Sequence, residues 1–567
     1  MKSYKVTSPT VASDRELDDS AQHIRRGQVS VAEYGKREDG TYAWFSFRKL
    51  WAFTGPGWLM SIAYLDPGNI ESDLQAGAIA GYKLMWVLWW STVIGLILQL
   101  LSARLGVVTG LNMAQLARRK YSKTSRYTLW IMMEIAVITS DIQEVIGSAI
   151  AIYILSDHKI PLFGGVLITG ADTFTFLLLE RYGLRKLEAL FAVLVSTLAI
   201  TFGYMYSEVV GPGDGAQIAE ATVVPSVPDG AVEQAVGILG AVIMPHNLYL
   251  YSALVLSRDI DNKDPGQINE ANKYYGVETT VALFVSFIIN MFVVVVFAIG
   301  FTDITNPQQY SHCQVDAPVF NTSDPTASVC FSDNIDLFHA GCCLGQRFGS
   351  NFKYIWAVGL LAAGQSSTMT GTYAGQFIME GFLDIKIAPW KRVLLTRTCA
   401  MVPTIAVALT ASPTKLGDIN EWMNVAQSFV LPFALIPLLH FTRMPTIMAD
   451  YRNGSALQVF NWLVTLTVLA INIETVLATF DFATIPVWQS FVIISIMIVY
   501  LVYVLWLIVG PLLKLSYFAS WYDDAPKQAN VYEGDFSSQS FDSFSIQETN
   551  PLLDKSGAQH GTDPYGI

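Results

Sequence analysis

Two short polar interruptions inside apolar segments carry the side chains that could do chemistry. They read Asp66-Pro67-Gly68-Asn69 and Met244-Pro245-His246-Asn247. A charged side chain in membrane hydrocarbon costs roughly 3 kcal/mol on insertion scales, so it usually marks a function. Proline and glycine break a helix, and hydrocarbon tolerates broken backbone only where it is buried in protein or lines a cavity. The two interruptions therefore predict a binding site formed by a pair of broken helices.

The residues at the interruptions suit a divalent metal ion. Asp66 offers a hard anionic oxygen, Asn69 a neutral oxygen and Met244 a soft thioether. Ala63 and Ala241 stand one helical turn before the two breaks, where their carbonyls lose their helical partners. A thioether beside oxygens favours transition metals over Mg²⁺ and Ca²⁺, so we expect Mn²⁺ or Fe²⁺. A methionine in a membrane span more often fills a packing gap, and Met244 is set apart by its place at the second break.

A second group of polar residues could carry protons. His246 lies beside the second break, and imidazole titrates near the pH of an acidic compartment. Glu134, Asp141 and Glu144 are spaced to share one helix face in the third apolar segment. Arg397, in the ninth segment, is the most obvious cationic partner. A proton path is our preferred interpretation, and a static ion-pair network that only locks helices together is the alternative.

The composition predicts a polytopic membrane protein. Of 567 residues, 52% are hydrophobic and 14% are charged, whereas about 25% are charged in a soluble domain. The net charge of -12 argues against a nucleic-acid partner, which requires a basic surface. Four of the five cysteines lie in or beside one polar loop, and spacing leaves their pairing open, with Cys313–Cys330 as one candidate bridge.

Twelve apolar segments are long enough to cross a bilayer as helices. They lie at about 51–79, 84–108, 127–155, 162–180, 187–207, 234–257, 276–300, 352–380, 393–411, 422–441, 457–478 and 486–513. Basic residues gather in alternate loops, such as Arg443 and Arg452 after the tenth segment, and the loop at 208–233 contains five acidic residues and no Lys or Arg. The positive-inside rule therefore places both ends of the chain in the cytoplasm.

The segments predict a transmembrane transporter domain at 49–513 between cytoplasmic tails at 1–48 and 514–567. The extracellular or luminal loop at 301–350 contains a glycosylation sequon at Asn321. The two interruptions fall in spans one and six, which indicates an all-α inverted repeat of five plus five helices followed by two extra helices. Glu548, Leu552 and Leu553 match an adaptor-read endolysosomal sorting signal, or match it by chance in a polar tail.

These motifs resemble those of the NRAMP (natural resistance-associated macrophage protein) family, close to its animal divalent metal transporter branch. The third motif that carries the resemblance is the run of small and hydroxylated residues at 364–371. The family implies proton-coupled import of Mn²⁺ or Fe²⁺ into the cytosol. Its metal ligands match Asp66, Asn69, Met244 and the carbonyls of Ala63 and Ala241, and Gln427 resembles a polar residue that lines the outward-facing site. Its proton-linked residues match Asp66, His246, Asp141, Glu144 and Arg397.

One position departs from the family pattern. Many members have a second histidine five residues after the first, where this sequence has Tyr251. Tyrosine forms hydrogen bonds but does not carry a proton near neutral pH, so a pH dependence that rests on that histidine is in doubt for this chain.

We therefore expect an alternating-access symporter in the plasma membrane or the endosome–lysosome system, with neither enzymatic activity nor a prosthetic group. Its transported substrates are the metal ion and the proton, and its surroundings are the lipid bilayer. The alternatives are an inverted-repeat symporter for an amino acid or another organic solute, a metal-permeable channel, and a metal sensor without transport.

Overall fold

The fold is built almost entirely from helices. The computed structural model describes residues 29–30, 45–180, 184–228, 230–301, 336–383, 414–479 and 486–512, with isolated positions between 391 and 406. Within this part of the chain, eight helical segments are long and apolar enough to cross a membrane. By length alone, the longest helices in the described part are α5 (Met85–Thr109), α7 (Lys123–Leu155), α9 (Leu184–Val209), α13 (Pro265–Phe301), α15 (Ser350–Leu383), α20 (Ser455–Thr479) and α21 (Val487–Leu512), and α15 is not among those eight segments.

The first and sixth spans are broken, as the sequence predicts. The first contains α3 (Pro56–Ile62) and α4 (Pro67–Ala80), preceded by the short α2 (Phe47–Phe53). The sixth contains α11 (Val232–Val242) and α12 (Pro245–Leu254), followed by the 3-10 turn η1 (Val255–Ser257). A proline begins the second half of each span, because the first helical position needs no backbone donor.

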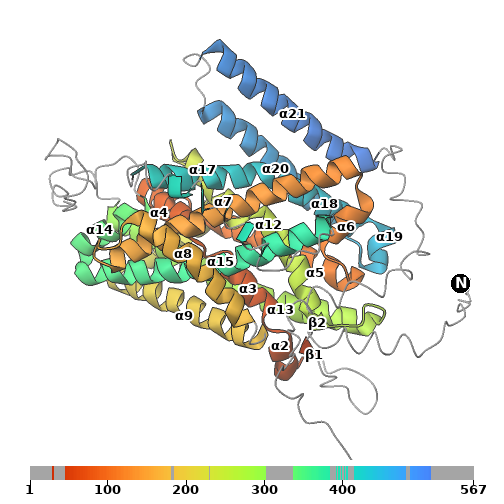
Figure 1. Cartoon of the computed structure of the whole chain (residues 1–567), viewed down its shortest axis with the longest axis horizontal. Coiled ribbons are helices and arrows are strands. Elements are labelled where there is room, and N and C mark those ends of the chain that lie inside the picture. Colours follow the sequence, from red (N-terminus) through yellow and green to blue (C-terminus); the bar gives the residue numbers. More distant parts are fainter. Residues whose placement is uncertain are drawn as a thin grey trace, which may run out of the picture.

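Longer helices surround the broken ones (Figure 1). Helix α13 packs against α3, α4, α5 and α9, and α15 packs against α7, α9 and α12. Helix α7 also packs against α8 (Leu162–Glu180) and α17 (Thr414–Val430), and α17 in turn packs against α11 and α4. The two breaks therefore lie in the most buried part of the bundle, with α7 and α17 on the same side.

Several helices lie outside the predicted spans. They are the amphipathic α6 (Met113–Lys120), α10 (Asp214–Val223), which lies within the predicted loop at 208–233, and α14 (Leu337–Phe348), which lies within the predicted loop at 301–350. The tenth span is also divided, since Pro432 starts a new helix, α18 (Pro432–Arg443), directly after Leu431.

Two short turns, α19 (Pro445–Met448) and η4 (Ala449–Tyr451), follow α18 and lead to α20. A two-residue parallel pair joins β1 (Val29–Ser30) to β2 (Arg258–Asp259), so part of the predicted N-terminal tail contacts the bundle. Cys343 in α14 is disulfide-bonded. Several predicted features lie outside the described residues, namely Asn321, Arg397, Cys313, Cys330 and the motif at Glu548, Leu552 and Leu553.

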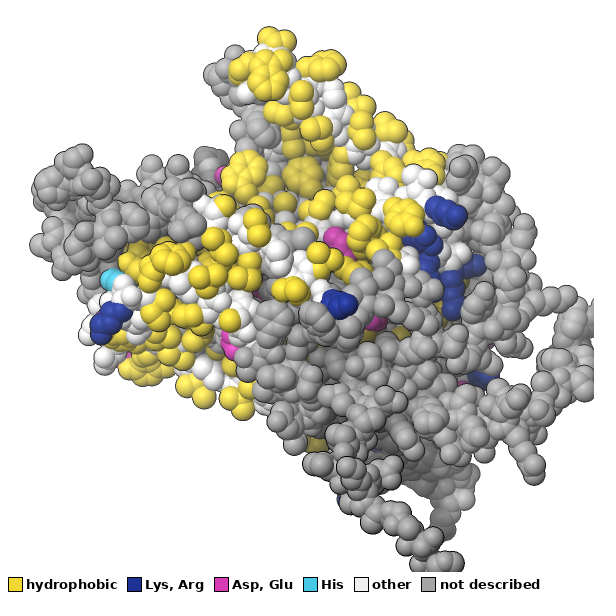
Figure 2. Space-filling view, viewed as in Figure 1, with side chains coloured by type: hydrophobic (Ala, Val, Ile, Leu, Met, Phe, Trp, Pro, Cys, Tyr) yellow, Lys and Arg dark blue, Asp and Glu magenta, His cyan; other side chains and the backbone are white. Residues whose placement is uncertain are grey.

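Helices α20 and α21 form the predicted addition at the end of the bundle. Both pack against α18, and they extend beyond the other helices at the top of Figure 1. Figure 2 shows their surface covered with hydrophobic side chains. Val487 is 86% exposed and Ile496 is 66% exposed, as expected of helices that face lipid.

Candidate metal-binding site

The two breaks meet at Asn69. Its amide Nδ2 donates to Asp66 Oδ1 at 2.6 Å and to the carbonyl oxygen of Ala241 at 3.1 Å. Its backbone N–H donates to the same Asp66 oxygen at 2.9 Å, which makes Asp66 the N-cap of α4. The structure therefore brings together three of the predicted ligand residues, from both broken spans.

Two oxygen atoms at this meeting point have no hydrogen-bond partner among the described residues. They are Asp66 Oδ2 and Asn69 Oδ1, and both side chains are 1% exposed. Most buried polar atoms in proteins are hydrogen-bonded, because leaving one unpaired costs about 1–3 kcal/mol. Asp66 and Asn69 therefore each keep one buried oxygen without a hydrogen-bond partner among the described residues, which is the kind of atom that a cation binds.

The backbone adds further oxygens for a chemical reason. Pro67 follows Ala63 by four residues, and Pro245 follows Ala241 by the same interval. Proline has no N–H, so neither alanine carbonyl can accept the i+4 hydrogen bond that a continuous helix would give it. The Ala241 carbonyl accepts from Asn69 in its place.

Met244 and Gln427 lie on the segments next to this centre. Met244 is the N-cap of α12 and is 2% exposed. Gln427 is fully buried in α17, donates from Nε2 to Gln143 Oε1 of α7 at 2.9 Å, and keeps its Oε1 without a hydrogen-bond partner among the described residues. Gln143 in turn lies against Gly68, where an added Cβ would come within 2.7 Å of its Oε1.

Asn424 of α17 closes the end of the bundle where α14 lies. Its Nδ2 donates to the Gly68 carbonyl at 3.1 Å and to Ser72 Oγ at 2.9 Å, both in α4. Its Oδ1 accepts from Gln143 Nε2 at 2.8 Å. Asn424 thereby ties together three helices, α4, α7 and α17.

The opposite end, which holds β2, is closed by Arg258. Its guanidinium donates to the carbonyls of Ala52 at 3.1 Å and Thr54 at 2.8 Å, and it pairs with Glu188 at 2.8 Å. Beside it, Glu278 accepts from the backbone N–H groups of Gly55 and Gly57 at the start of α3. These contacts hold α2 and α3 against α9 and α13.

Asp66, His246, Asp141 and Glu144 are buried, whereas Glu134 is half-buried and accepts a hydrogen bond from Trp130 Nε1 at 2.8 Å. Asp141 and Glu144 lie on α7, Ser140 donates to Glu144 at 3.2 Å, and Gly371 of α15 packs directly against both carboxylates. His246 is buried at the start of α12, and its Nδ1 has no hydrogen-bond partner among the described residues. The small residues of 364–371 thus serve as close packing of α15 on α7.

Comparison with known proteins decides the family. The natural resistance-associated macrophage protein-like family matches residues 57–478. The chain belongs to the NRAMP family. It is 55% identical to natural resistance-associated macrophage protein 2 of Mus musculus over 76% of both chains, and 46% identical to protein Malvolio of Drosophila melanogaster over 94% of this chain and 88% of that one. The crystal structure of the Eremococcus coleocola manganese transporter shares its fold, with a TM-score of 0.70 and 29% identity over 86% of this chain and 100% of that chain.

In this NRAMP family member, Tyr251 stands at the position where the resemblance leads us to expect a second histidine. The side chain is fully buried in α12, and its hydroxyl is hydrogen-bonded to Thr279 Oγ1 of α13. The position therefore joins α12 to α13 by a neutral hydrogen bond.

The sequence prediction missed the residues that close the two ends. None of Arg258, Asn424 and Gln143 is predicted from the sequence as a functional residue. The available signal was the presence of strongly polar side chains at the edges of apolar segments, which are expensive to bury unless paired.

Proposed function

We propose that this NRAMP family member is a proton-coupled symporter that imports Mn²⁺ or Fe²⁺ into the cytosol by alternating access. The observation that carries the proposal is the pair of unpaired buried oxygens, Asp66 Oδ2 and Asn69 Oδ1, beside the Ala241 carbonyl. The relative with a solved structure is named a manganese transporter, which supports a divalent metal as the substrate.

Asp66, Asn69, Met244 and the carbonyls of Ala63 and Ala241 would hold the cation. Cation binding takes the oxygens to which the Asn69 amide now donates, so the amide must turn to present its own oxygen. The Met244 thioether favours a transition metal over Ca²⁺ and Mg²⁺, because hard cations prefer oxygen ligands alone. Gln427 would join when α17 moves.

Alternating access requires two closures that open in turn. The Arg258 contacts close the β2 end and the Asn424 contacts close the α14 end. With the basic loops in the cytoplasm, the Arg258 contacts form the inner closure and the Asn424 contacts the outer one. A channel needs no such pair of closures, so their presence favours a carrier.

His246, Asp141 and Glu144 would carry the proton from the site toward the cytosol, and Arg397, which keeps its charge, would be their cationic partner. Asp66 is where metal and proton meet, because its charge decides whether a divalent cation binds. Proton binding to these groups is what lets an acidic exterior or lumen drive uptake.

The test is uptake of radiolabelled Mn²⁺ into proteoliposomes at mildly acidic and at neutral external pH, with Asp66→Ala alongside. We expect saturable uptake, stimulated by acid and lost in the variant. Uptake unchanged in a normally folded Asp66→Ala protein would overturn the site. Metal binding without uptake by the wild type would support a sensor, and uptake of an organic solute alone would support the other symporter class.

A further inference from the structure

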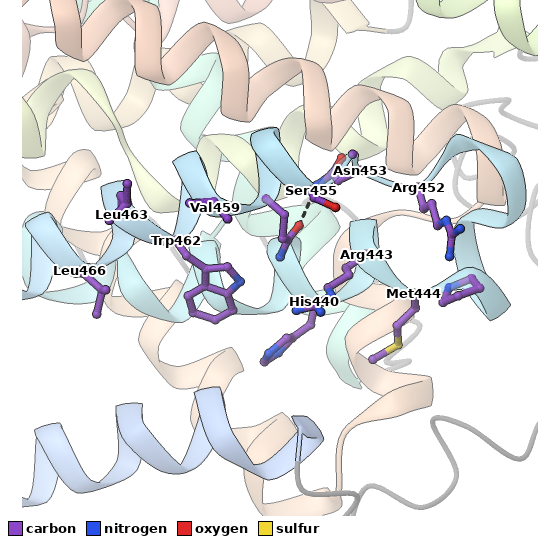
Figure 3. Close-up of a pocket in the computed structure, with 13 residues that line it drawn as sticks. His440, Arg443, Met444, Arg452, Asn453, Ser455, Val459, Trp462, Leu463 and Leu466 are labelled. Carbon is purple, nitrogen blue, oxygen red and sulfur yellow. Dashed lines mark hydrogen bonds between the residues drawn. The ribbon is translucent and has the colours of Figure 1, made fainter.

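A groove on the outside of the bundle plays no part in the proposed transport path. It lies between α18 and the start of α20, has a volume of about 880 Å³, and contains no residue of the broken helices α3, α4, α11 or α12 (Figure 3). One end of the groove is cationic and the rest of it is apolar. A ligand that fills it therefore needs an anionic portion for the first part and an apolar portion for the second.

The cationic end contains Arg443, at the end of α18, and Arg452, just before α20. Both side chains are exposed, and within the described part of the chain neither forms an ion pair or a hydrogen bond. Asp450, the single carboxylate of the connection at 444–454, pairs with neither. Ser455 also lines this end and begins α20, so the first N–H groups of that helix add to its affinity for an anion.

The apolar part follows one face of α20. Val459, Leu463 and Leu466 are 59%, 58% and 53% exposed, at the i, i+4, i+7 spacing of a single helix face. Trp462 packs against the His440 ring, with 5.6 Å between ring centroids, and forms the wall toward α18. From Ser455 to Leu466 the helix rises about 16 Å, close to the roughly 15 Å depth of one hydrocarbon leaflet.

We propose that this groove binds an anionic phospholipid. Its negatively charged headgroup lies between Arg443 and Arg452, and an acyl chain lies along Val459, Leu463 and Leu466. Basic pockets between transmembrane helices at the cytoplasmic side bind such headgroups, and each Arg near the surface contributes to the attraction. The site does not depend on metal transport, and only its assignment to the cytoplasmic leaflet rests on the proposed orientation.

The length match favours a lipid over a soluble anion. A free phosphate would use the two arginines alone and leave the three exposed apolar side chains without a role. A lipid uses both parts, because its charged group and its chain are joined at the spacing that the groove offers. Figure 3 shows the apolar side chains continuing along α20 from the end where Arg452 and Arg443 lie.

The experiment uses the purified full-length protein in detergent, titrated with phosphatidylserine or phosphatidylcholine of equal chain length, with bound lipid counted by native mass spectrometry. We expect phosphatidylserine to bind preferentially. The double variant R443Q/R452Q should weaken its binding roughly 30-fold, taking about 1 kcal/mol for each arginine. R443K/R452K should keep most of the preference, and R48Q/K263Q, which removes two exposed cations outside the groove, should leave it unchanged.

A second variant keeps the charges and fills the apolar part. Val459→Trp should lower phosphatidylserine binding while it leaves both arginines in place, which keeps the test valid if R443Q/R452Q folds poorly. Equal binding of the two lipids, or binding unaffected by both variants, would overturn the proposal. Full competition by inorganic phosphate would also overturn it, since that result would identify a site for soluble anions.

Discussion

Asn69 and Ala241, 172 positions apart in the sequence, are joined by a hydrogen bond of 3.1 Å from an amide nitrogen to a backbone carbonyl. The same amide nitrogen also donates to Asp66 at 2.6 Å. One NH₂ group thus holds two oxygens of the proposed metal site toward a common point. A cation at that point would replace both hydrogen bonds and would give a partner to the buried Asp66 and Asn69 oxygens that have none in this structure.

Asn69→Ala should weaken Mn²⁺ uptake without abolishing it. The variant loses one neutral ligand oxygen but keeps the Asp66 charge, so we expect KM to rise roughly 10-fold, or about 1.4 kcal/mol. Initial rates in proteoliposomes over a range of Mn²⁺ concentrations measure this. Asn472→Ala, which removes a buried amide of α20, is the matched control, and an equal effect there would indicate general destabilisation.

Met244→Ala should change selectivity more than rate. Loss of the thioether leaves an oxygen-only site, so Mn²⁺ transport should persist in part while Ca²⁺ or Mg²⁺ begins to enter or compete. Competition of Ca²⁺ against labelled Mn²⁺ measures the change. Met205→Ala, at a buried methionine of α9, should keep the wild-type selectivity. Unchanged competition in Met244→Ala would count against a role for the sulfur atom.

Arg258→Ala should open the β2 end. It removes the ion pair with Glu188 and the hydrogen bonds to the carbonyls of Ala52 and Thr54, and hydrogen bonds to a charged group are worth about 1.5–3 kcal/mol each, a loss that here falls on the closed arrangement. A reporter cysteine placed at Ser61 of α3, which is fully buried, should react faster with a water-soluble thiol reagent. Arg258→Lys keeps the positive charge but lacks the planar guanidinium group, so the reporter cysteine should react at an intermediate rate. No change in either variant would show that these contacts do not control the opening.

Asn424→Ala should open the α14 end of the bundle and leave the β2 end closed. It removes the hydrogen bonds that tie α17 to Gly68 and Ser72 of α4, worth about 1 kcal/mol each. A reporter cysteine at Ala76 of α4, which is fully buried and is not a partner of Asn424, should become reactive toward reagent added from the α14 end, while the Ser61 reporter does not speed up. If both variants expose the same reporter, the two clusters are not alternate closures.

The ion pair of Asp157 with Lys353 should fade at acidic pH. Hydrogen bonds from Tyr354 and Lys353 lower the pKa of Asp157 below its ordinary value. Its contribution to stability is therefore present above that ordinary value and is lost as pH falls through the lowered one. Asp157→Asn should slightly lower the melting temperature at neutral pH and have no effect once the wild-type carboxyl is protonated. An equal deficit at all pH values would exclude the carboxylate charge as the cause.

The broken helices could be predicted from the sequence because their cause is local. A proline four residues after Ala63, and another four after Ala241, remove the same backbone donor in every environment. A charged side chain in an apolar segment is equally easy to recognise. Burying a charge such as that of Asp66 in hydrocarbon costs free energy, so it usually marks a function. The family resemblance rests on the same residues.

The closures could not be predicted, because their partners are remote. Arg258 bonds to carbonyls 204 and 206 residues away, and Asn424 bonds to Gly68 across 356 residues. The division of the tenth span at Leu431 and Pro432 shows a further limit: hydropathy measures the length of an apolar segment and is insensitive to a break that leaves its composition apolar. The roles of Asp141, Glu144, His246 and Arg397 stay predictions.

The position of Asp66 as the N-cap of α4 has a mechanical consequence. One oxygen of its carboxylate holds the first turn of that helix, through the 2.9 Å bond from the Asn69 N–H, while the other oxygen is free to take a cation. A capping carboxylate stabilises a helix start by about 1 kcal/mol, and its negative charge interacts favourably with the helix dipole. Neutralising that charge, by a proton or by a metal ion, therefore loosens the first turn of α4. The carboxylate that would bind the transported ion therefore also determines how firmly the first turn of α4 is held.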